Sequence, residues 1–347
     1  MGAPPPPRVK TAAADGLKVG QRELDEKSAT GFVGLKNQGA TCYLNSLMQT
    51  LFFLPQVRDL VYSFEYDRDK HGTEAHCQIL QLQRLFARLE LCDLAAVDTV
   101  DLTTSFGWTS VDVFEQQDVQ ELFKVLLDRL EEALGEQGAA ALAAAFQGST
   151  TSFVHCAEIA YQSFRTEDMI DISLGVRGHD SIMDALRYFH KTETLSGSNK
   201  YQCEDAVLRD AERGSYFEKL PPILMFHLQR FVWDPDTGNR VKVCDKMEYP
   251  DSLTPENITQ LMTFGRPAGR EWDNTSGAEG CHALGGGGYD LFAVLVHVGG
   301  TQGGHYYSYI RPTGGEQWVE FNDSVVREVT PQTVFSLLAL LVHKYKY

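Results

Sequence analysis

The sequence predicts an α+β fold in which a helical lobe precedes a strand-rich lobe. Between residues 31 and about 148, apolar residues recur at helical spacing, most clearly in segment 80–89. From about residue 150 onward, short apolar and β-branched runs such as 151–155 and 222–228 are typical of strands. A chain of 347 residues with 43% hydrophobic content can bury a large core, either as one elaborate domain or as two.

Composition limits the classes of partner. The formal net charge of −16 argues against nucleic acid and anionic membranes, whose phosphates attract lysine and arginine, and favours a basic protein partner. The longest apolar runs, 291–298 and 334–342, fall short of the ~20 residues of a membrane span. Residues 1–30 begin with a proline run and stay polar, which predicts a disordered lead-in without the apolar core of a signal peptide. Seven scattered cysteines lack disulfide-framework spacing and indicate a reducing, intracellular compartment.

The first candidate for chemistry is Cys42, which the pattern places in the first turn of a helix. Apolar residues at helical spacing follow it and Pro55 stops the run, so a helix is expected over Cys42–Leu54. The amino end of a helix directs unpaired N–H groups at the sulfur and favours the nucleophilic thiolate. The alternative is that Cys42 is a small buried apolar residue, the usual role of a free cysteine.

A candidate base, His305, lies near the other end of the chain. It follows a predicted buried strand, 291–298, and a turn, 299–304, whose glycines let the backbone approach a ligand closely. The β-rich runs 306–310 and 318–322 then have the composition of a hairpin.

The register of that hairpin predicts a partner for His305. With a four-residue loop at Pro312–Gly315, His305 lies opposite Asn322, whose amide can orient the imidazole and fix its tautomer. A β-bulge would shift the register by one residue and give this role to Asp323. Each residue alone could be an ordinary turn or strand-end residue, but their opposition beside a glycine-rich turn favours a functional role.

Together, Cys42, His305 and Asn322 indicate nucleophilic acyl transfer. His305 would draw the proton from Cys42, the thiolate would attack a carbonyl, and His305 would return the proton to the leaving amine. Asn37, five residues before the nucleophile, is suited to donate its amide to the oxyanion, and such a donor is worth ~3 kcal/mol of barrier. Asn37 could instead, or also, supply the turn before the helix.

A second helix is predicted over Glu115–Leu134, with apolar residues on one face and acids on another. Carboxylates on this face would suit a basic partner segment. For Glu121 a merely solvated position is a fair alternative. His227 and His297 lie in apolar strand runs and are expected to be core residues rather than ligands.

Four segments, in this order, resemble the signature blocks of the ubiquitin-specific proteases. They are Gly34–Leu47, Phe114–Leu122, Leu228–Phe231, and Gly303–Tyr309 followed by Trp318–Asp323. The resemblance extends over about residues 32–330 and looks closest to the herpesvirus-associated type of that family.

The resemblance implies a papain-like cysteine protease fold, with a helical thumb over 31–150 and a β-rich palm with extended β fingers over 151–347. Carried over by position, it implies roles for four catalytic residues: Cys42 as nucleophile, His305 as base, Asn322 as third member and Asn37 as oxyanion donor.

The resemblance also implies a substrate. It assigns three residues to contact with the ubiquitin tail, namely Gln117, Asp118 and Glu121, and it places Phe231 and Tyr306 along the narrow part that admits Gly-Gly. The expected reaction is hydrolysis of the isopeptide bond after the C-terminal Gly-Gly of ubiquitin on protein conjugates. No cofactor is expected, and the protein is expected to be a monomer in the cytoplasm or nucleus.

The fingers depart from the family pattern. Many members hold a structural zinc with two Cys-x-x-Cys pairs, whereas each pair here keeps one sulfur, with Ile159 and Ala206 at the second positions of Cys156 and Cys203. Two thiolates cannot complete a tetrahedral site, so no bound zinc is expected, although His155 could supply a third ligand.

The end of the chain is a second departure. Residues 335–347 replace the final strand of the family, near an Ala-Tyr-x-Leu-x-Tyr motif, and could form a substitute strand or helix or mark a fragment. Three functional alternatives also stay open: a general papain-like protease, a processing enzyme for another ubiquitin-like modifier, and a catalytically silent ubiquitin-binding scaffold.

Overall fold

The computed structural model describes residues 27–109, 118–159, 161–203, 205, 207–267, 270, 288–301, 303–312, 316–335 and 339–345. The predicted lead-in up to residue 26 and the predicted tail-binding residue Gln117 lie outside the described residues. Residues 27–30 of the predicted lead-in are described, and there the Lys27 N–H donates to the carbonyl of Asp93 at 3.0 Å.

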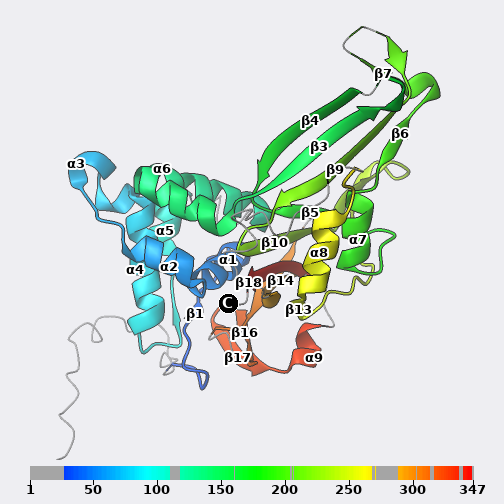
Figure 1. Ribbon diagram of the computed structural model, residues 1–347. Helices are drawn as coiled ribbons and strands as arrows, with labels where there is room; N and C mark the ends of the chain where they lie inside the picture. Colours follow the sequence, from blue (N-terminus) through cyan, green and yellow to red (C-terminus); the bar gives the residue numbers. More distant parts are fainter. Residues whose placement is uncertain are drawn as a thin grey trace, which may run out of the picture.

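Helices dominate the chain before residue 147, as the sequence predicts, and they form the lobe at the left of Figure 1. They are α1 (Cys42–Phe52), α2 (Pro55–Tyr62), α3 (Arg68–His71), α4 (Gln78–Leu91), α5 (Val100–Ser105) and α6 (Val119–Phe146). Two short strands in this lobe, β1 (Gly34–Leu35) and β2 (Ala96–Val97), pair in parallel.

The boundaries of α6 follow from two residues. Asp118 caps its amino end, because its side chain accepts the N–H of Gln120 at 2.8 Å, so the described helix begins at Val119. It continues beyond the predicted end at Leu134, but Gly135 interrupts the helical geometry with a φ of +66°. Glycine tolerates this left-handed conformation without a side-chain penalty, so the chain bends there and resumes a helix.

The fingers are a long four-stranded sheet in the order β4-β3-β9-β6, which projects away from the rest of the molecule in Figure 1. Its strands are β3 (Gly148–Cys156), β4 (Tyr161–Met169), β6 (Glu193–Leu195) and β9 (Ala211–Lys219). A small pair, β7 (Tyr201–Gln202) and β8 (Leu208–Arg209), lies at the far end.

The palm is an eight-stranded sheet in the order β17-β16-β15-β14-β18-β10-β5, with β13 paired to β14. Its strands are β5 (Ile172–Gly175), β10 (Ile223–Gln229), β13 (Ser252–Leu253), β14 (Tyr289–Gly299), β15 (Gly304–Ile310), β16 (Trp318–Asn322), β17 (Val325–Val329) and β18 (Ala339–Tyr345). A separate hairpin of β11 (Phe231–Asp234) and β12 (Asn239–Lys242) follows β10. The remaining helices are α7 (Ile182–Phe189), α8 (Pro255–Thr263) and α9 (Pro331–Val334).

Both faces of the palm sheet are buried, which explains why its central strands read as continuous apolar runs. Alternate residues of β10 enter different cores: Met225 packs with the thumb helices, and Leu224 packs with the cluster that includes α7 and α8. On the thumb side, α1 packs against β15 and β16 as well as α2 and α6, and every residue of α1 is buried. The helix ends at Phe52 rather than Leu54, because Pro55 starts α2.

The divergent end of the chain supplies a substitute strand. β18 lies inside the palm sheet, antiparallel to both β14 and β10. Of the strand and the helix that the sequence left open for this segment, the structure shows a strand over 339–345. Among the described residues, no helix combines the length and apolarity needed to cross a bilayer.

The contact between β1 and the β16–β17 turn gives a stability prediction. A Cβ added at Gly34 would lie 2.7 Å from the backbone oxygen of Asp323 and 2.8 Å from that of Ser324. Because these backbone atoms can move away only at a cost in free energy, we expect Gly34→Ala to lower the free energy of unfolding by about 1–3 kcal/mol. Urea denaturation measures this change. The control is Gly175→Ala in β5, where an added Cβ meets nothing within 4 Å, and equal midpoints for the two variants would contradict the prediction.

Candidate active site

The sulfur of Cys42 lies between the first turn of α1 and the start of β15. Its side chain is buried, and the backbone N–H of Tyr306 donates to Sγ at 3.3 Å. Tyr306 directly follows His305 in β15. The fold therefore unites the thiol from the first lobe with the strand that carries the predicted base.

Asn37 organises the loop that delivers Cys42. Its side-chain oxygen accepts the N–H groups of Gly39 and Thr41 at 2.8 and 3.1 Å, which is the turn-forming role that the sequence left open. Its Nδ2 donates to Asp323 Oδ2 at 3.0 Å. An amide NH₂ carries two hydrogens, so this bond leaves one for another acceptor. The predicted oxyanion role is therefore compatible with the turn.

His305 and Asn322 are in direct contact. The distance from His305 Nε2 to Asn322 Oδ1 is 2.7 Å. An amide oxygen can only accept, so Nε2 carries the proton and Nδ1 keeps a lone pair. This is the tautomer in which His305 can take a proton through Nδ1.

The predicted register of the hairpin is wrong by two residues. In the structure Ser308 pairs with Phe321 and Ile310 with Val319, so the ladder does not place His305 directly opposite Asn322. A shift of two keeps every side chain on its face, and it makes His305 and Asn322 diagonal neighbours that side chains of this length can bridge.

Asp323 has a different set of contacts from Asn322. It occupies the β16–β17 turn with a φ of +49°, and its Oδ2 lies 4.0 Å from His305 Nε2. Its carboxylate accepts from Asn37 Nδ2 and, at 2.8 Å, from Asn45 Nδ2 of α1. Of the two alternatives for orienting His305, Asn322 makes the direct hydrogen bond, and Asp323 holds the loop and helix around the nucleophile.

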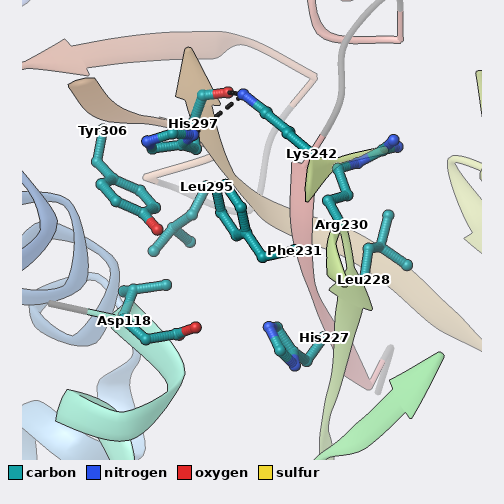
Figure 2. Close-up of a pocket in the computed structure, with 10 residues that line it drawn as sticks. Asp118, His227, Leu228, Arg230, Phe231, Lys242, Leu295, His297 and Tyr306 are labelled. Atoms are coloured by element: carbon teal, nitrogen blue, oxygen red, sulfur yellow. Dashed lines mark hydrogen bonds between the residues drawn. The ribbon is translucent and has the colours of Figure 1, made fainter. Parts of the chain in front are cut away.

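Three of the residues that the resemblance assigns to the tail line one cavity beside this site. Figure 2 shows Asp118, Phe231 and Tyr306 around it, contributed by the start of α6, the β11–β12 hairpin and β15. Glu121 is exposed in the first turn of α6 and is not among the described residues that line the cavity. Gln117 lies outside the described residues.

His227 and His297 are half-buried rather than fully in the core, and both side chains line this cavity (Figure 2). Burial, with the nearby Lys242 cation as a further cause, lowers the pKa of His297 to about 4. Lys242 Nζ lies 3.0 Å from His297 Nδ1 and donates to the carbonyls of His297 and Gly299 at 2.8 and 2.9 Å. A signal was present in the sequence: the glycine turn pairs His297 with Tyr306, next to the predicted base.

The fingers bring together the two cysteines left from the family's zinc pairs. Cys156 and Cys203 are buried with their sulfurs 3.1 Å apart, while Ile159 is exposed. His155 occupies the alternate face of β3 from Cys156. The part of the chain that is described contains no group of three or more His, Cys, Asp or Glu side chains able to hold a metal. That the fingers bind no zinc stays a prediction.

Comparison with known proteins identifies relatives over most of the chain. The family model described as ubiquitin carboxyl-terminal hydrolase matches residues 33–343. Ubiquitin carboxyl-terminal hydrolase 15 of Saccharomyces cerevisiae is 36% identical over 312 residues, which cover 90% of this chain and 24% of the relative. Ubiquitin C-terminal hydrolase 13 of Arabidopsis thaliana is 39% identical over 303 residues, covering 87% and 26%. The chain thus spans about a quarter of the length of these curated relatives.

The contacts of Asp323 predict a measurable cost for a small change. The Asp323 carboxylate accepts hydrogen bonds from the side-chain amides of Asn37 and Asn45. In Asp323→Asn, the new NH₂ group must replace one of the two accepting oxygens and face one of these donors. Losing one such hydrogen bond, and leaving its donor unpaired, should lower the free energy of unfolding by about 1–3 kcal/mol. Thermal denaturation checks this. Ser324→Ala, at the exposed next position of the same turn, is the control, and comparable losses for both variants would contradict the assigned contacts.

Proposed function

Because the chain belongs to the ubiquitin carboxyl-terminal hydrolase family, we propose that it is a thiol-dependent deubiquitinase. It hydrolyses the isopeptide bond after the C-terminal Gly-Gly of ubiquitin on protein conjugates. The observation that carries this proposal is the placement of His305, hydrogen-bonded to Asn322 and adjacent in sequence to the residue whose N–H contacts the Cys42 sulfur.

Each of these groups has a defined role in the proposed reaction. His305 takes the thiol proton through Nδ1, and the Cys42 thiolate attacks the carbonyl carbon of the terminal glycine. The second hydrogen of the Asn37 amide stabilises the oxyanion that forms. His305 then gives its proton to the leaving lysine amine, and a water deprotonated by His305 hydrolyses the thioester. Asn322 holds the imidazole and stabilises the imidazolium that forms in both steps.

The cavity in Figure 2 supports a ubiquitin tail as the substrate. Phe231 and Tyr306 are bulky walls near the nucleophile, and such walls favour glycine over residues with side chains. Asp118 contributes a carboxylate for an arginine of the tail, since charge-assisted hydrogen bonds to arginine are strong. Gln117 and Glu121 are proposed to contact the same tail.

The finer assignments belong to the same proposal. Within the family, the order and composition of the four motif blocks favour the herpesvirus-associated type. None of the cysteines in the described part of the chain forms a disulfide, which favours a reducing compartment such as the cytoplasm or nucleus. We propose that ubiquitin and ubiquitinated proteins are the partners, that nucleic acid and membranes are not, and that the catalytic unit is a monomer needing no cofactor.

Reaction with ubiquitin that carries a C-terminal electrophile tests the chemistry. We expect stoichiometric labelling of the wild type, none of Cys42→Ala, and labelling of His305→Ala slowed about 10²–10⁴-fold, because the general base is lost. Cys244→Ala removes an exposed thiol and should be labelled at the wild-type rate. Labelling that persists in Cys42→Ala shows that the nucleophile is misassigned.

The same assay separates the alternatives. Preferential labelling by an electrophile made from another ubiquitin-like modifier favours a processing enzyme for that modifier, and cleavage of ordinary fluorogenic peptides favours a general protease. Ubiquitin binding without labelling of the wild type favours a silent scaffold.

The role of Asp118 gives a prediction for substrate binding. Asp118→Asn keeps an amino-end cap for α6 but removes the charge. We expect KM for a fluorogenic ubiquitin amide to rise about 10-fold, as for the loss of one charge-assisted hydrogen bond. With a substrate whose tail arginines are replaced by glutamine, the same substitution should change KM less than twofold. Equal effects on KM for both substrates would show that Asp118 does not recognise the tail arginines. Glu121→Gln, at the exposed acid one turn further along α6, serves as the comparison.

A further inference from the structure

A buried carboxylate is linked to His305 through Asn322 and takes no part in the proposed proton transfers. Glu320, in β16, is only 2% exposed. It accepts from Asn322 Nδ2 at 3.2 Å, and Arg327 of β17 donates to it from Nε and Nη2 at 2.9–3.1 Å. The strands pair Glu320 directly with Arg327, so a line of contacts runs from Arg327 through Glu320 and Asn322 to His305.

These contacts determine which way the Asn322 amide is oriented. An amide can present either its oxygen or its NH₂ group to the imidazole. If the NH₂ of Asn322 faced His305, Nε2 would have to accept, and the ring proton would sit on Nδ1, the nitrogen that must take the thiol proton. A carboxylate at this position would present oxygen from either side and would not have this ambiguity.

Glu320 removes the ambiguity because a carboxylate accepts only. Its oxygen requires the NH₂ of Asn322 to face it, and this turns the amide oxygen toward His305. Burying a carboxylate costs free energy unless it is paired, and the two-pronged contact with Arg327 provides the pairing while the Arg327 side chain stays 64% exposed.

We propose that Glu320 is a positioning residue that fixes the orientation of the Asn322 amide and, through it, the Nε2–H tautomer of His305, with Arg327 holding Glu320 in place. The proposal rests on the proposed function, and it adds residues outside the four motif-derived catalytic positions. It predicts that the effect of a Glu320 substitution on kcat depends on the residue at position 322.

A double-mutant cycle tests this dependence. Glu320→Gln keeps the shape, but its NH₂ group must face either Asn322 or Arg327. In the wild-type background we expect kcat for a fluorogenic ubiquitin amide to fall about 10- to 100-fold, short of the ~10⁴-fold loss of a triad locked in the wrong tautomer. KM should change less than twofold, because Glu320 does not line the described cavity.

In the Asn322→Asp background, the effect of Glu320→Gln on kcat should change from a loss to a gain. The new carboxylate needs no orientation and instead stands against Glu320 at hydrogen-bond distance, where two negative charges repel. Adding Glu320→Gln to Asn322→Asp should therefore raise kcat at least about threefold, since the glutamine NH₂ can donate to the new carboxylate. A merely structural Glu320 predicts a loss in both backgrounds, and that result would overturn the proposal.

Glu328→Gln is the matched control. It removes the same charge from an exposed position of β17 opposite Val319, away from the line of contacts, and should leave kcat unchanged in both backgrounds.

A second measurement reads the tautomer without any reaction. Nitrogen-15 NMR of labelled histidine, with His305 assigned through His305→Gln, is recorded at about pH 8, where an ordinary imidazole is neutral. We expect the Nε2–H form in the wild type and an increased Nδ1–H population in Glu320→Gln. An unchanged tautomer in Glu320→Gln would contradict the proposal even if kcat falls. If the wild type does not cleave ubiquitin substrates, the proposed function fails, and this spectrum still decides the role of Glu320.

Discussion

The candidate active site depends on one set of hydrogen bonds, through which the β16–β17 turn holds the segment that carries Cys42. Asp323 accepts the Leu35 N–H with its backbone oxygen at 2.9 Å, and its carboxylate accepts from Asn37 and Asn45. These three donors belong to the strand, the loop and the helix around Cys42. One turn residue therefore fixes the position of the thiol relative to the palm, and hydrogen bonds to a charged acceptor are the stronger kind.

Strand β16 and its neighbour β15 contribute both to packing and to the polar contacts of the candidate site. Ile310, Val319 and Phe321 belong to the apolar core under α1, which gives the thiol a rigid support. Glu320 and Asn322 alternate with these residues and form the polar line that reaches the imidazole. In a weakly polar surrounding, hydrogen bonds that follow one another strengthen each other. The same sheet thus supplies both the apolar surface under the helix of Cys42 and the hydrogen-bonded contacts of His305.

The hairpin shows how far local patterns reach. Alternation of residue types predicts the two strands and the face of each side chain, because the side-chain period of a strand is two. Alternation does not fix the length of the connecting loop, and the predicted pairing register of β15 and β16 was therefore wrong by two residues. His305 still meets Asn322, because an even slip preserves the face. The helical start at Cys42 was likewise predicted, because it depends on residues within a few positions. The cap at Asp118 was not, since the sequence predicted this helix from Glu115 onward.

The sequence by itself determined which chemical groups are available: a thiol at a helix start, an imidazole after a glycine turn, and an amide on the adjoining strand. Only the tertiary structure decided that Asp323 holds Asn37 across 286 positions of the chain and that His227 and His297 line a cavity. It also decided that a buried Glu320 faces Asn322. The reason is physical. The free energy of such contacts depends on distance, burial and charge between strands that pack together, and no pattern of neighbouring residues contains those quantities.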